Sequence, residues 1–141
     1  GQKNQDTRGD MQYRYAPDWA EIEKQLKDDK SLLAYHKELI SVRNQYSALR
    51  TGDFSVISPE GQNSSIAAYM LEKDGERLIC VFNFSGNNYT TVTLDVDNLP
   101  TENAVCKKVL GATDAAATLN NAKMTVSDLS AYSVQVYLIT L

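Results

Sequence analysis

The spacing of the apolar residues changes at Gly52, and this change constrains the fold more than any other feature of the sequence. Between Ser31 and Gly52, apolar side chains recur at intervals of three and four residues, which predicts one long helix with an apolar stripe. From Asp53 onward, short runs alternate between apolar and polar residues, which is typical of antiparallel strands. The residues of the helical stripe are Leu32, Tyr35, Leu39, Val42, Tyr46 and Leu49.

The part of the chain after Gly52 predicts a sheet built from hairpins. Asp74-Gly75 lies between two apolar runs, and this pair favours a type I′ turn because both central residues need a positive φ. Residues 78–84 are apolar on both faces, which places this run centrally in a sheet. We therefore expect a mainly β fold, an antiparallel β-sandwich of about seven or eight strands of Greek-key type, preceded by two helices. The predicted strands are 54–57, 65–73, 76–84, 90–96, 105–110, 123–126 and 131–141, with a small-residue loop at 111–121.

A shorter helix is expected before the long one. Asp18 followed by Glu21 forms a capping-box pattern, so a helix should begin here and continue to about Lys27. Ser31 is placed to cap the long helix. The inner face of the shorter helix is predicted to consist of Trp19, Ile22 and Leu26.

Two segments follow from this pattern. Residues 1–52 comprise an irregular leader and two helices, and residues 53–141 comprise the sandwich. A chain of 141 residues is well short of the ~250 residues that a (β/α)₈ barrel needs. The formal charge of −4 argues against a nucleic-acid partner, and no apolar run approaches the roughly 18 residues of a membrane span.

The residues that usually carry chemistry are few. His36 is the only histidine, and two cysteines are too few for a structural zinc site, so we expect no metal and no cofactor. Cys80 is interpreted as a small buried apolar residue, with a disulfide to Cys106 as the alternative. Carboxylate pairs of the glycosidase type would have to come from acids beside turns, where we expect solvation instead. These acids are Asp53, Glu60, Glu72, Asp74, Glu76, Asp95 and Asp97.

Aromatic side chains are the remaining candidates for binding. Tyr13, Tyr15 and Trp19 lie close together in the sequence, and their rings could either stack on sugars or fix the leader to a core. The tyrosines further along the chain lie in predicted strands, where β-propensity alone accounts for them. These are Tyr69, Tyr89, Tyr132 and Tyr137.

Three segments resemble glycoside hydrolase family 13, the α-amylase family. Ser31-Leu32-Leu33, Leu39-Ile40-Ser41-Val42-Arg43 and Ala48-Leu49-Arg50-Thr51-Gly52 are similar to the last helix of the family's catalytic barrel. Residues 79–86, ICVFNFSG, resemble the central strand of its C-terminal β-sandwich, and LSAYSVQVYLI resembles the closing strand.

The leader resembles a loop of the same family. In some members the loop after the eighth barrel strand reads Asp-x-x-Arg-x-Pro-Met-Gln-Trp. Arg8, Met11 and Gln12 occupy their places here. Asp6 lies one position nearer, Asp10 stands for the proline and Tyr13 stands for the tryptophan. The resemblance implies that Arg8, Gln12 and Tyr13 lie on a loop near the substrate, with Tyr15 and Trp19 as further candidates for sugar stacking.

The resemblance implies a piece of a larger enzyme. The catalytic carboxylates of the family lie upstream, so this chain would be inactive alone and would stabilise a catalytic barrel through its helical stripe. The parent would cleave or transfer α-glucosidic bonds of starch or maltooligosaccharides by the retaining mechanism. An extracellular or cell-surface location is favoured if it degrades polysaccharide.

Three alternatives follow from the same sequence. An autonomous carbohydrate-binding sandwich would retain affinity for maltooligosaccharides when isolated. A sandwich of unrelated descent would serve adhesion or act as a scaffold. An uncovered apolar stripe could also join two copies into a homodimer.

Overall fold

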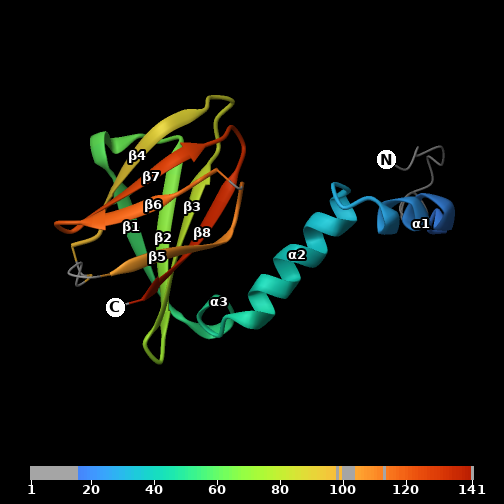
Figure 1. Cartoon of the computed structure of the whole chain (residues 1–141), viewed down its shortest axis with the longest axis horizontal. Helices are drawn as coiled ribbons and strands as arrows, with labels where there is room; N and C mark the ends of the chain where they lie inside the picture. Colours follow the sequence, from blue (N-terminus) through green and yellow to red (C-terminus); the bar gives the residue numbers. More distant parts are fainter. Residues whose placement is uncertain (1–15, 98, 100–103, 113, 141) are drawn as a thin grey trace, which may run out of the picture. The chain divides into compact units, whose positions relative to one another are not determined.

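The computed structural model of the chain describes residues 16–97, 99, 104–112 and 114–140 (Figure 1). The chain divides into two compact units, of which the first ends at Leu39 and the second begins at Ile40. The described helices are α1 (Trp19–Lys27), α2 (Leu32–Gln45) and α3 (Ala48–Thr51), with a short 3-10 turn η2 (Glu60–Gln62).

The helix starts predicted from the sequence are confirmed. The backbone N–H of Glu21 donates to Asp18 Oδ1 at 3.1 Å, so the first turn of α1 is capped. The Ser31 hydroxyl accepts from the Ala34 N–H at 3.1 Å and caps α2. The predicted inner face of α1 is wrong for the described residues, because Trp19 and Leu26 are exposed and no residue of α1 is buried.

The prediction of one long helix is also wrong. The helix stops after Gln45, and a new turn, α3, begins at Ala48. The cause is the Glu76 carboxylate, which accepts from the Ala48 N–H at 2.8 Å and from the Ser47 hydroxyl at 3.2 Å. A carboxylate that accepts from a free N–H stabilises the start of a new helix. The apolar spacing therefore continues through α3, although the helix is interrupted after Gln45.

The mainly β, antiparallel fold is confirmed. Six of its strands are β1 (Asp53–Pro59), β2 (Ile66–Lys73), β3 (Glu76–Asn83), β4 (Tyr89–Asp95), β5 (Val105–Leu110) and β7 (Lys123–Leu129). The closing strand is β8 (Val134–Thr140). The predicted small-residue loop 111–121 is wrong over part of its length, because Ala117–Asn120 forms strand β6 paired with β7.

The strands form one sheet in the order β5-β8-β3-β2-β1-β4-β7-β6. Strands β1, β2 and β3 follow one another, and β4 returns to lie beside β1, which is the Greek-key arrangement. The predicted β2–β3 hairpin is confirmed, since Asp74 and Gly75 have φ values of 51° and 84°. Figure 1 shows β4, β7 and β6 passing in front of the strands β1, β2, β3 and β8.

The core lies between these two layers. Ile79, Val81 and Tyr137 come from one layer, and Leu94 and Met124 come from the other.

Cys80 is buried and free, as the sequence indicated. It pairs in register with Val136, whereas Cys106 pairs with the core residue Ile139, so the two thiols lie on opposite faces of the sheet. In the described residues no helix is long and apolar enough to cross a membrane.

Candidate functional site

The sheet carries a second apolar surface on the side that faces away from the core. Side chains alternate along β1, β2 and β3, so the neighbours of core residues such as Ile57 and Ala68 point to the opposite face. We call this surface the aromatic face. It comprises Phe54, Val56, Tyr69, Leu71, Leu78, Cys80, Phe82 and Phe84.

Aromatic rings form a continuous ladder across this face. The ring centroids of Phe54 and Tyr69 lie 5.0 Å apart, and those of Tyr69 and Phe82 lie 5.5 Å apart. Phe82 stacks on Phe84 at 5.8 Å with nearly parallel planes. Offset and tilted rings at these distances attract one another, so the ladder forms a rigid apolar surface.

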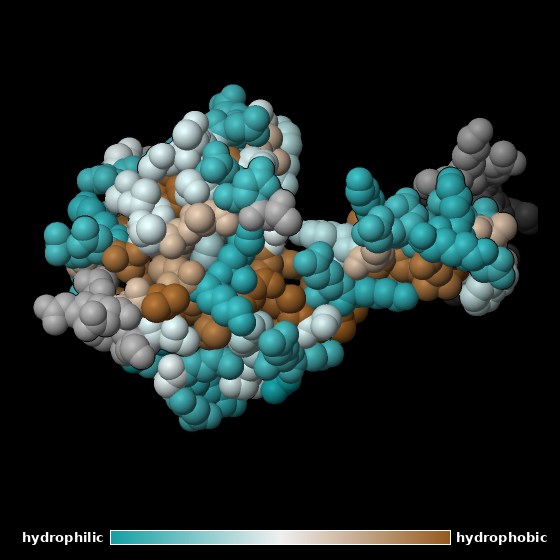
Figure 2. All heavy atoms as spheres, viewed as in Figure 1, coloured by the Kyte–Doolittle hydropathy of each residue, from teal (hydrophilic) through white to brown (hydrophobic). Residues whose placement is uncertain are grey.

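The outer part of the aromatic face is uncovered in the described chain. Phe54 is 61% exposed, Val56 is 75% exposed and Phe84 is 65% exposed. Figure 2 shows further apolar residues in brown on the side of the sandwich that is turned toward the viewer and on the helical segment. Soluble proteins seldom expose several large apolar groups together unless a partner covers them. This face is therefore suited to bind a protein surface.

Part of the chain already covers one end of the sheet. Tyr46 and Ala48, at the turn between α2 and α3, are buried. The Glu76 carboxylate, at the start of β3, fixes this turn through Ser47 and Ala48. Gly52 closes α3 with its N–H bonded to the Ala48 carbonyl at 2.9 Å, and a Cβ there would lie 2.5 Å from that oxygen. Only glycine fits at this position without moving the backbone.

The titratable groups of the aromatic face stay neutral near physiological pH. Burial raises the pKa of the Cys80 thiol to about 11. Burial also raises the pKa of Tyr69 to about 12, with a further contribution from Cys80, its partner in register. A thiol with a raised pKa is a poor nucleophile, so the chemistry of this face is packing.

The helical stripe predicted from the sequence is only partly covered. Leu32 and Tyr35 are exposed, and Leu39, Val42 and Leu49 are half-buried. Tyr46 is buried at the end of α2. The role of this stripe in packing against a barrel stays a prediction.

The predicted sugar-contacting residues fall mostly outside the described part. Arg8, Gln12, Tyr13 and Tyr15 lie outside the described residues. Trp19 lies in the first turn of α1, exposed to solvent. Tyr132 is exposed in the turn before β8, so the prediction that it packs in the sheet is wrong, whereas Tyr137 is buried in the core as expected.

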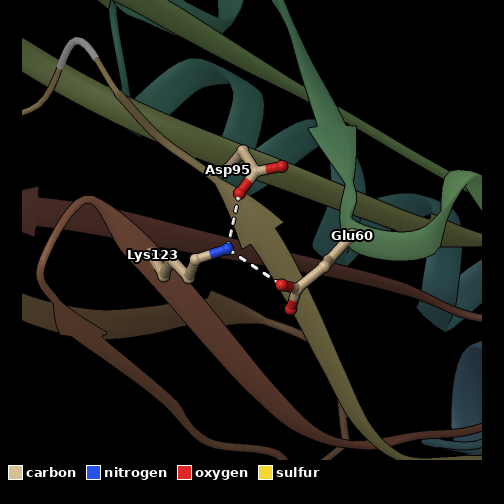
Figure 3. A network of polar contacts seen from close by, with 3 residues as sticks. All are labelled: Glu60, Asp95 and Lys123. Carbon is tan, nitrogen blue, oxygen red and sulfur yellow. Dashed lines mark hydrogen bonds and ion pairs between the residues drawn. The ribbon is translucent and has the colours of Figure 1, made fainter.

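Two of the candidate acids meet at one lysine. Lys123 Nζ lies 3.0 Å from Glu60 Oε1 and 3.0 Å from Asp95 Oδ1 (Figure 3). The hydrogen bond that Lys123 donates to Glu60, followed by the one it donates to Asp95, raises the pKa of Lys123. Lys123 bonds both acids and joins η2, β4 and β7, which indicates a structural role. Among the described residues no group of three or more His, Cys, Asp and Glu side chains could hold a metal ion.

Sequence reasoning missed the aromatic face as a site. The signal was present in residues 78–82, which are apolar at successive positions, and in Phe84. A strand that is apolar on both faces needs cover on both sides. One side is the core, and the other side is the surface that bears Phe82 and Phe84.

Comparison with curated proteins finds relatives of part of the chain. The Probable oligo-1,6-glucosidase 2 of Bacillus subtilis (strain 168) is 38% identical over 64 residues, which is 45% of this chain and 11% of that protein. A Cyclomaltodextrinase from a Bacillus species is 39% identical over 57 residues, which is 40% of this chain and 10% of that protein. The matches therefore span about a tenth of these relatives' length. No protein-family model matches the chain.

Solved structures share the fold over most of the chain. The trehalose-6-phosphate hydrolase TreA of Bacillus licheniformis aligns with a TM-score of 0.63 and 22% identity, over 89% of this chain and 22% of that protein. The trehalulose synthase MutB of Pseudomonas mesoacidophila MX-45 aligns with a TM-score of 0.62 and 22% identity, over 88% of this chain and 21% of that protein. These alignments show a shared fold, and together with the partial sequence matches they support a C-terminal portion of a glycoside hydrolase family 13 enzyme, the α-amylase family.

Proposed function

We propose that this chain is the non-catalytic C-terminal part of an α-amylase-like glycosidase that acts on α-glucans, and that it stabilises the catalytic barrel of that enzyme. The curated relatives are named as a glucosidase and a cyclomaltodextrinase, which supports glucan chemistry for the parent. They are also far longer than this chain, which leaves room for a barrel in the parent.

The observation that carries the proposal is the uncovered part of the aromatic face. Burying a Phe or Val side chain that is now in water stabilises a protein by about 1.5–3 kcal/mol. Phe54, Val56 and Phe84 are all available for such burial. Leu32 and Tyr35 of α2 are exposed apolar groups of the same kind. The occupant we propose is the remainder of the same polypeptide.

The first test concerns the coding sequence upstream of Gly1. A barrel of about 250 residues, with the catalytic carboxylates of a retaining glycosidase, is the expected finding. A stop codon or a signal peptide directly upstream contradicts the proposal. In that case the chain is a free-standing sandwich.

The second test compares the same variants in two proteins. We expect Val56→Ser to change the stability of the 141-residue chain by less than about 0.5 kcal/mol, because its side chain is already in water. Phe54→Ser also loses the contact with the Tyr69 ring and should cost about 0.5–1.5 kcal/mol there. In the longer enzyme each should cost about 1.5–3 kcal/mol. Thr91→Ala, at an exposed position of β4, is the control that should be neutral in both. Equal effects in the two proteins would show that this face is not covered.

The oligomeric state of the isolated chain tests whether a second copy of the chain, rather than the remainder of the enzyme, covers the apolar surface. Sedimentation velocity should give a monomer whose apolar surface binds a hydrophobic dye. A dimer that Leu32→Ser dissociates would assign the helical stripe to a second copy of the chain.

A further inference from the structure

Tyr132 has an unusual backbone conformation for its residue type. Its φ is 49°, in the left-handed region that bulky residues rarely adopt, and its side chain is 78% exposed. Burial of the ring therefore does not offset the free-energy cost of this backbone conformation. Strain of this kind persists where the surrounding structure enforces it, and it concentrates at binding and catalytic sites.

The Tyr132 ring lies against Gly86 of the β3–β4 loop. A Cβ at Gly86 would be 3.3 Å from Tyr132 Oη and 3.7 Å from both Cε2 and Cζ. Gly86 itself has no positive φ, so the glycine serves this close approach rather than a turn. The ring is thus supported from one side by backbone and open to solvent elsewhere.

The two loops that hold this ring are fixed by buried Asn83. Its amide nitrogen donates to the Asn87 carbonyl at 2.7 Å and to the Ser130 carbonyl at 2.8 Å. Its amide oxygen accepts from the Ser85 N–H at 3.0 Å and from the Ser85 hydroxyl at 2.8 Å. Both loops are therefore set in one arrangement, and Asn83 acts as a positioning residue.

Further bonds join the loops beside the ring. The Tyr132 N–H donates to the Ser85 carbonyl at 3.1 Å, and the Ala131 N–H donates to Asn88 Oδ1 at 2.8 Å. Asn87, Asn88 and Ser130 are exposed in these loops. The loops that carry the ring therefore also carry exposed neutral amide and hydroxyl side chains.

We propose that Tyr132, supported by Gly86 and held between loops that expose Asn87, Asn88 and Ser130, is a binding platform for a pyranose ring of a glucan chain. The C–H face of a pyranose is flat and apolar, so it packs on an exposed aromatic ring. Its hydroxyls lie at the edge, where amide and hydroxyl side chains can bond them. The choice of an α-glucan rests on the proposed function.

The test is a titration of the 141-residue chain with maltoheptaose, followed by calorimetry and by amide chemical shifts. We expect weak binding, with shifts centred on residues 85–88 and 130–133. Tyr132→Ala should weaken binding about tenfold or more, and Tyr132→Phe should retain it because the ring remains. The matched control is Trp19→Ala, which removes an exposed aromatic ring from α1 and should leave binding unchanged.

Two further variants separate binding from folding. Tyr132→Gly should abolish binding while raising the melting temperature, because glycine adopts a positive φ without strain. Gly86→Ala should weaken binding, since its Cβ pushes against the Tyr132 hydroxyl. A rise in stability with loss of binding is a result that a merely structural tyrosine would not give.

Several results overturn the platform. No heat and no shifts with the unmodified chain would do so, as would equal binding by Tyr132→Ala. Loss of binding in Trp19→Ala would transfer the site to α1. Shifts at 85–88 and 130–133 that appear only with the remainder of the enzyme would make Tyr132 a protein contact. None of these results bears on Phe54 and Val56, so the proposed docking role is tested separately.

Discussion

The sandwich buries most of its apolar side chains, with the outer part of the aromatic face as the exception, whereas the two N-terminal helices contain no buried residue. Leu78, Leu94 and Met124 of the sandwich are completely buried. In contrast, no residue of α1 or α2 is buried. A helix gains most of its stability in a protein from packing its apolar side, so these helices lack what the sandwich has. The difference indicates that the sandwich folds on its own core and that the helices are suited to a surface elsewhere.

The largest effect expected from this contrast is in the core. Leu94→Ala should cost about 2–5 kcal/mol of unfolding free energy, because it leaves a cavity in a packed interior. Leu32→Ala makes the same change on exposed α2 and should stay within about 0.5 kcal/mol. Urea denaturation followed by circular dichroism measures both. Equal losses would mean that the helices already hold a core of their own.

The next largest effect is a loss of folding stability at alkaline pH, caused by ionisation of Cys80. Its pKa rises from 9.0 to about 11 in the folded chain, so the folded state disfavours the thiolate. The stability from the neutral thiol is complete below pH 9 and is lost as the pH rises toward 11. Two pKa units correspond to roughly 3 kcal/mol. Denaturation midpoints between pH 8 and 11 give the measurement.

Cys80→Val provides the control for this pH dependence. Valine removes the titrating thiol from the aromatic face and keeps an apolar side chain there. Its stability should fall less steeply over the same pH range. Tyr69, whose pKa rises to about 12, still titrates in both proteins and affects the upper end of the range. An unchanged slope in Cys80→Val would assign the alkaline loss to other groups.

Glu76 fixes the turn between α2 and α3, and a smaller effect is expected there. Glu76→Ala removes the acceptor for the Ala48 N–H and the Ser47 hydroxyl, which should cost about 1–2 kcal/mol. Glu76→Gln keeps a neutral acceptor and should cost less. Glu23→Ala, on exposed α1, is the control and should be neutral. If Glu76→Ala is also neutral, packing of Tyr46 and Ala48 alone holds the turn.

The parts of the fold that depend on local sequence could be predicted. Asp18 and Ser31 cap their helices because a side-chain oxygen three residues before a free N–H is a local feature. Asp74-Gly75 determines its hairpin because the turn needs two positive φ values. In each case the partners lie close in the chain.

The failures depend on residues that are distant in the sequence. The break after Gln45 is caused by Glu76, 28 residues after Ala48 along the chain. Strand β6 looked like a loop because Ala117–Asn120 has little β-propensity, and its pairing with β7 decides its structure. The arrangement of Tyr132 over Gly86 likewise needs two loops that the Greek-key topology brings together. The aromatic face could be suspected from residues 78–84, but its extent required the register of β1 and β2.

The smallest effect is expected at Lys123, on the surface of the sandwich. Its ammonium contacts Glu60 and Asp95, and all three side chains are partly in solvent, so Lys123→Met should cause only a small loss. Because these bonds raise the pKa of Lys123, their contribution is present below the ordinary value of 10.5 and is lost at higher pH. Salt near 1 M shortens the Debye length to about 3 Å and should remove the difference from the unmodified chain. Lys24→Met, which breaks the 3.7 Å pair with Glu21 on α1, should show the same salt dependence. A loss of stability in Lys123→Met that persists in high salt would mean that the alkyl stem of Lys123 packs against the sandwich. Apolar contact rather than charge would then stabilise the junction of η2, β4 and β7.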